Sequence, residues 1–159
     1  MRRMLATALF APLMATAAAA NDDPPGRKPG LWEVAIERGA KIQTMQACVD
    51  AASEQAALVK GKQSLAEICS RFESHLDGNT YTQDTVCRLM GSVQTSRTVM
   101  TIVSDEARET VIASRYDPPM MGKETSQTKQ TSRWLGPCGP DMKPGQIKVN
   151  GMIISGPAM

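Results

Sequence analysis

The stretch "CSRFESHLDGNTYTQDTVC" (residues 69–87) has a cysteine at each end and a turn signal, Asp-Gly-Asn at 77–79, in its middle. These turn residues tolerate positive φ or hydrogen-bond their own backbone, so they favour a tight connection between two strands. Folding the stretch symmetrically around Gly78 places Cys69 opposite Cys87. Directly opposite side chains have Cβ atoms about 4.5–5.5 Å apart, which a disulfide can bridge after slight adjustment. We therefore predict a disulfide-linked β-hairpin.

The same symmetrical folding places His75 opposite Tyr81, and it leaves two cysteines, Cys48 and Cys138, to form a second disulfide by elimination. A metal site is the alternative, but it needs close pairs such as C-x-x-C together with histidines. The cysteines here are 21, 18 and 51 positions apart, and the chain has one histidine. A redox centre also lacks its C-x-x-C pair. We expect two structural disulfides, no metal site and no cofactor.

The chain begins MRRMLATALFAPLMATAAAANDD, which has the three parts of a secretory signal peptide. Arg2 and Arg3 form the basic start, Leu5–Ala15 the short apolar run, and Ala18 and Ala20 the small-residue cleavage site. A buried N-terminal helix is the alternative. We predict a signal peptide at 1–20 and a mature protein in the periplasm, where disulfides form.

Removal of this segment leaves 139 of the 159 residues, a typical length for one domain. It also lowers the 18 basic residues to 16, which equals the 16 acidic residues, so the net charge falls from +2 to zero. A neutral chain is not typical of proteins that bind nucleic acid or anionic membranes, because phosphate binding needs a concentrated basic surface. We expect a monomer that binds no nucleic acid and has no stable membrane span after signal removal.

Three segments follow the predicted signal peptide. Residues 21–30 are rich in proline, glycine and charge and are predicted to be an exposed leader. Residues 31–138 are predicted to form a single β-rich domain, which contains one short helix over 50–60 that ends at Gly61. The glycine-rich stretch 139–159 is interpreted as a tail that carries at most one short strand.

Alternating apolar residues, as in "LWEVAIE" (31–37), indicate about seven strands joined by hairpins. The fold class is therefore mainly β (α+β): a curved antiparallel sheet or incomplete barrel of about seven strands, with one short helix and two disulfides. "ETSQTKQTSRW" (124–134) is polar on both faces, so we expect it to be a solvent-facing edge strand. Its polarity serves solubility or, alternatively, docking of a partner strand.

Two short stretches, "KPGLWEV" (28–34) and "RWLGPC" (133–138), together with the spaced cysteines, resemble a known family. The chain is similar over residues 28–138 to the proteobacterial exported family called domain of unknown function 3617. The resemblance implies a periplasmic location and a small β-rich domain. It implies no activity, because none is assigned to the family.

His75 is the candidate general base, with Asp77 or Asp84 beside it. No G-x-S-x-G elbow identifies a nucleophile, and a lone histidine beside a turn is usually a surface residue. We therefore assign no catalytic residue and expect a non-enzymatic protein. The methionines are scattered, so filling gaps in the core explains them better than Cu(I) binding.

Trp32 and Trp134 are the candidate ligand-binding residues, because they lie near the two ends of the domain and could line the mouth of a cup. Alternatively they close the core where the terminal strands meet. The leading hypothesis is a periplasmic binding module for a small apolar ligand or a protein partner. The alternative is a cell-envelope interaction module that acts through an edge strand or the tail, and a hydrolase using His75 has the least support.

Overall fold

A single nine-stranded antiparallel sheet forms most of the structure. The computed structural model describes residues 22–155, so the predicted signal peptide at 1–20 lies outside the described residues. The strands are β1 (Gly30–Arg38), β2 (Lys41–Val49), β3 (Cys69–Asp77), β4 (Thr80–Leu89), β5 (Ser92–Ser104), β6 (Ala107–Met120), β7 (Lys123–Gly136), β8 (Gln146–Val149) and β9 (Met152–Ser155). Their order across the sheet is β3-β4-β5-β6-β7-β1-β2-β8-β9.

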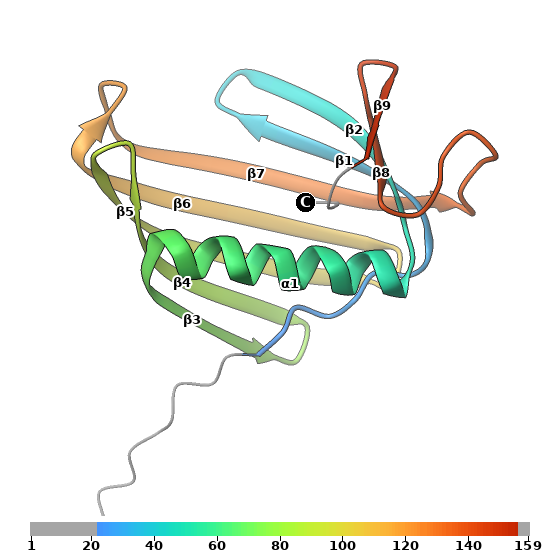
Figure 1. Cartoon of the computed structure of the whole chain (residues 1–159), viewed down its shortest axis with the longest axis horizontal. Helices are drawn as coiled ribbons and strands as arrows, with labels where there is room; N and C mark the ends of the chain where they lie inside the picture. Colours follow the sequence, from blue (N-terminus) through green and yellow to red (C-terminus); the bar gives the residue numbers. More distant parts are fainter. Residues whose placement is uncertain (1–21, 156–159) are drawn as a thin grey trace, which may run out of the picture.

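The predicted curved antiparallel sheet is confirmed, and the sheet is open, with β3 and β9 at its two edges (Figure 1). Seven strands lie between residues 30 and 136, as the sequence predicts. The tail contributes two further short strands, β8 and β9, where at most one was expected. The first strand, β1, lies inside the sheet between β7 and β2.

One helix, α1 (Ala51–Ile68), connects β2 to β3 and runs along one face of the sheet (Figure 1). Asp50 caps it through a reciprocal pair of hydrogen bonds with Ser53. The predicted end at Gly61 is wrong, because the helix continues to Ile68. A glycine inside a helix costs only about 1 kcal/mol relative to alanine. The strong helix formers around Gly61 offset that cost, so α1 has 18 residues.

Both predicted disulfides, Cys69–Cys87 and Cys48–Cys138, are present. The expected register of the hairpin is wrong by one residue, because His75 lies opposite Thr82 rather than Tyr81. A register shift between Cys69 and Arg71 restores the pairing of the two cysteines. A β-bulge of this kind inserts one unpaired residue into a strand, so the disulfide forms although the pairs near the turn are displaced.

The polar strand β7 is not an edge strand, which corrects the sequence-based expectation. It pairs with β6 on one side and with β1 on the other. Its inward face carries Gln130 and Ser132, which line an internal groove rather than a packed core. A strand that faces solvent on one side and a groove on the other is polar on both faces without being at an edge.

The apolar core occupies only one part of the sheet. It lies on β1, β2 and β8, and it consists of Trp32, Val34, Ile36, Met45, Ala47, Val49 and Ile147, with Trp134 and Val149 packed against them. Across the sheet the same face becomes polar: Val34 lies opposite Ser132 on β7, which in turn lies opposite Arg108 on β6. The inner face is therefore half core and half polar surface.

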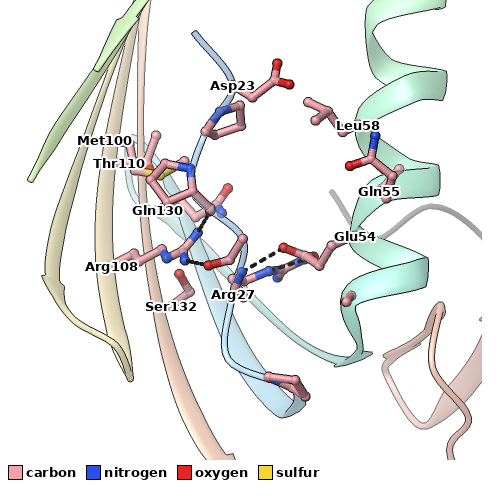
Figure 2. A pocket seen from close by; sticks show the side chains of 16 residues that line it. Asp23, Arg27, Glu54, Gln55, Leu58, Met100, Arg108, Thr110, Gln130 and Ser132 are labelled. Carbon is pink, nitrogen blue, oxygen red and sulfur yellow. Dashed lines mark hydrogen bonds and ion pairs between the residues drawn. The ribbon is translucent and has the colours of Figure 1, made fainter. Parts of the chain in front are cut away.

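Residues 22–29, which we call the strap, run between α1 and the sheet (Figure 2). This segment was expected to be an exposed leader, but five of its eight residues are partly buried. Near its start, Asp22 bonds β3 through the Ser74 hydroxyl and the Leu76 amide. The strap is therefore only partly exposed, and it belongs to the interior side of the fold.

Candidate functional site

The candidate site is a groove of about 460 Å³ between the sheet, the strap and the first half of α1 (Figure 2). We call it the groove. This volume lies within the range of about 300–1,000 Å³ that is usual for small-ligand sites. The groove lies over the polar half of the inner face.

The floor of the groove comes from three neighbouring strands. Its residues are Met100 of β5, Arg108 and Thr110 of β6, and Gln130 and Ser132 of β7. Residues directly opposite on paired strands share a face, and Thr110 lies opposite both Met100 and Gln130. The floor is thus a continuous set of mostly polar side chains.

The wall of the groove is the inward side of α1. Glu54, Gln55, Ala57 and Leu58 line it. Not one of the 18 residues of α1, all of which the structure describes, is buried. A helix that covers a sheet normally buries an apolar stripe against it. Here the groove separates the helix from the sheet, so Ala57 and Leu58 on the inward side of α1 are only partly buried.

The strap is fastened to both sides of the groove. On the helix side, the Arg27 guanidinium and its backbone amide both bond the Glu54 carboxylate, and Lys62 pairs with Asp23. On the sheet side, the Arg108 guanidinium donates to the carbonyls of Pro25 and Gly26, at 2.8 and 2.5 Å. The strap therefore fills part of the groove with its own backbone.

Arg108 is the most unusual charged group of the site, because it is only 8% exposed. Burial lowers the pKa of Arg108, and the positive charge of Arg27 lowers it further, while Glu54 raises it. The Nε atom is buried and has no hydrogen-bond partner among the described residues. The indole ring of Trp32, 5.8 Å from the guanidinium carbon, offers a further contact to the cation.

The structure places Trp32 and Trp134 side by side, as directly opposite residues on β1 and β7. Trp32 is fully buried in the core, and neither indole is among the residues that line the groove. Their N–H groups donate to Lys28 and Pro29 carbonyls of the strap, at 2.8 and 3.1 Å. Both tryptophans thus hold the strap, and through it they border the groove indirectly.

His75 lies on an exposed part of β3 and is not among the groove residues. The structure pairs its ring Nδ1 with the Asp22 carboxylate, at 3.2 Å. Neither Asp77 nor Asp84 makes this contact: the pairing partner of Asp84 is Arg97. Within residues 22–155 no group of three or more His, Cys, Asp or Glu side chains is placed to hold a metal ion.

Sequence reasoning missed Arg108 and the groove. In "RETVIASRY" (108–116) the two alternating faces are Arg108, Thr110, Ile112 and Ser114 on one side and Glu109, Val111, Ala113 and Arg115 on the other. Neither set is apolar, so periodicity does not show which face points inward. One signal could have indicated the groove. The neighbouring strands β6 and β7 both carry polar residues on their inward faces, and the domain has one helix to cover them.

The fold and the groove define a class: a small, disulfide-linked, open antiparallel sheet with one helix and a partly filled groove. Within it, the chain belongs to the family described as Protein of unknown function (DUF3617), whose model matches residues 27–138. No curated protein and no solved structure matches the chain. In the described part of the chain, no helix is long and apolar enough to cross a membrane.

The two stretches that carry the family resemblance contact each other in the structure. Leu31 and Trp32 lie opposite Gly136 and Trp134, respectively. A Cβ atom at Gly30 would collide with the Trp134 ring and the Gly136 carbonyl. The Lys28 ammonium lies 3.8 Å from the centre of the Trp134 ring. These residues together form the anchor for the end of the strap.

Proposed function

We propose that this protein is an exported, non-enzymatic binding module of the periplasm, which holds a small extended ligand in the groove. The observation that carries the proposal is the unfilled space between α1 and the sheet. The helix buries none of its residues, and the strands beneath it present Thr110, Gln130, Ser132 and Arg108 instead of an apolar layer. This polar surface beneath the helix contributes little to the stability of the fold, but it suits a ligand that replaces the water in the groove.

The lining favours an amphipathic ligand over the purely apolar one expected from the sequence. Leu58, Ala57 and Met100 provide apolar contacts, while the strands provide hydroxyl, amide and guanidinium groups. Ligand sites typically combine an apolar lining with a few polar groups that fix orientation. The two disulfides and the signal-like N-terminus support export to an oxidising compartment.

The test is native mass spectrometry of the mature protein purified from a bacterial periplasm. The expected result is a discrete adduct that is lost on denaturation. Ala57→Trp should abolish the adduct, because residue 57 lines the groove. Ala56→Trp is the matched control, since Ala56 is exposed and is not a lining residue. A bare protein in every preparation, or an adduct that survives Ala57→Trp unchanged, would contradict the proposal.

A second candidate function, strand addition by an envelope partner, is favoured by the edge strand β9. Its side chains are exposed, including Met152, Ile153 and Ile154 at 68%, 40% and 52%. Exposed apolar edge strands pair readily with other chains. A photocrosslinker at Ile153 should then capture one discrete partner, whereas the same group at Val103, exposed on the internal strand β5, should not. Equal labelling at both positions would reject this candidate.

A further inference from the structure

The positive charge of Arg108 is not matched by an acidic residue of the groove. Two carboxylates line the groove, and both are already paired: Glu54 with Arg27 and Asp23 with Lys62. No described carboxylate forms an ion pair with Arg108. A buried cation without a counter-charge is costly to maintain. The groove therefore carries one unmatched positive charge on its floor.

The strap occupies the position that an anion would take. Two oxygen atoms, the carbonyls of Pro25 and Gly26, accept from the two terminal nitrogens of Arg108. Carboxylates and phosphates bind arginine with the same two-oxygen arrangement, and with stronger hydrogen bonds because they are charged. The Nε–H donor stays unused in the present contact. The strap backbone is thus an incomplete substitute for an anionic group.

We infer that the ligand of the groove is an amphiphile with a single anionic head group, which binds Arg108 in place of the Pro25 and Gly26 carbonyls. The inference rests on the proposed function and adds the chemical class of the ligand. The apolar chain of the amphiphile lies along Leu58, Ala57 and Met100. Head group and chain thus use the two kinds of surface that the groove brings together.

The test is titration of the mature protein by isothermal calorimetry with decanoate, decyl phosphate and the uncharged decanol. A hydrogen bond to a charged group is worth more than a neutral one by about tenfold in affinity, so both anions should bind at least about tenfold more tightly than decanol. The ratio between decanoate and decyl phosphate then identifies whether a carboxylate or a phosphate head group is preferred. Acetate and inorganic phosphate measure the contribution of the head group alone.

Arg108→Met should reduce the ratio of anion affinity to decanol affinity to within about twofold of unity, because the charged hydrogen bonds are lost. Arg115→Met is the matched control, because Arg115 lies on the same strand but is exposed on the opposite face. If Arg108→Met does not fold, Ser132→Asp serves instead. Ser132 lies directly opposite Arg108, so the new carboxylate would pair with it and exclude anions but not decanol.

The outcomes separate the inference from the proposed function. If decanol and the anions bind the wild-type protein equally, or if Arg108→Met or Ser132→Asp keeps the preference, the anion site is wrong and the groove remains a binding site. If none of the three amphiphiles binds, both the inference and the proposed function are rejected. Binding with a preference lost only in the groove variants supports both.

Discussion

Trp32 and Trp134 lie opposite each other on neighbouring strands, and their indole N–H groups donate to consecutive carbonyls of the strap, those of Lys28 and Pro29. The two ends of the family-matched region are thereby joined at one point. The same strap also contains Pro25 and Gly26, whose carbonyls Arg108 holds. The tryptophan pair therefore helps to position the part of the strap that lies in the groove.

Replacing Trp134 with Phe should loosen the strap while keeping an aromatic ring over β7. The variant loses the N–H donor to Pro29, and we expect a loss of about 0.5–1.5 kcal/mol in the free energy of unfolding. Hydrogen exchange at the Arg27 amide, which bonds Glu54, should become faster. Urea unfolding and exchange mass spectrometry measure the two effects. Unchanged exchange in the strap would show that the indole does not hold it.

Gly30→Ala should be considerably more damaging than Gly39→Ala. Both glycines have positive φ, 138° and 61°, a conformation that costs a residue with a side chain about 1–3 kcal/mol. At Gly39 the added Cβ meets nothing, whereas at Gly30 it collides with the Trp134 ring and a backbone carbonyl. We expect Gly30→Ala to lose at least about 1 kcal/mol more in chemical denaturation. Equal losses would mean that Trp134 moves aside freely.

Arg27→Met should weaken the attachment of the strap to α1. The Arg27–Glu54 pair is largely shielded, with side-chain exposures of 9% and 18%, and hydrogen bonds to charged groups in such places contribute about 1.5–3 kcal/mol. Arg71→Met is the control, because the Arg71–Glu73 pair is exposed and such pairs contribute about 0–1 kcal/mol. Thermal unfolding of the two variants compares the losses. A similar loss in both would show that the Arg27–Glu54 pair contributes no more to stability than an exposed pair.

The pH dependence of stability should include a contribution from the cap of α1. The hydrogen bond from the Ser53 backbone amide holds the pKa of Asp50 below its ordinary value of 3.8 in the folded protein. The stabilising contribution is therefore present above pH 3.8 and is lost as the pH falls through the lower folded-state pKa. Asp50→Asn keeps a capping oxygen but cannot titrate, so its thermal stability should fall less steeply below pH 4. Parallel curves for both proteins would contradict this assignment.

Local patterns predicted the individual strands and the Cys69–Cys87 disulfide, because alternation and turn residues act over short distances. The Cys48–Cys138 disulfide followed by elimination. The local patterns gave the wrong pairs near the turn at Gly78, since the bulge between Cys69 and Arg71 has no sequence signature as clear as a turn. The predicted pairing of Cys69 with Cys87 is nevertheless correct, because the bulge shifts the register by one residue between Arg71 and Cys69.

The groove could not be predicted, because it depends on what covers the polar half of the inner face. The polarity of 124–134 is equally expected for an edge strand and for a groove floor, and only the pairing of β7 on both sides distinguishes them. The strap raised the same difficulty. Its prolines, glycine and charges are typical of an exposed leader, yet its backbone carbonyls bind Arg108 and the two tryptophans.

Because β1 lies between β7 and β2, the first strand of the sheet acquires its second neighbour only when the seventh strand has formed. Its pairing with β7 joins residues about 100 positions apart, and contacts at such separations form slowly. Until β7 is available, the β1–β2 hairpin presents β1, with Trp32, Val34 and Ile36, at an unpaired edge. During synthesis the chain therefore exposes an aggregation-prone strand edge until β7 has formed. A truncated chain that stops before residue 123 keeps this edge exposed permanently.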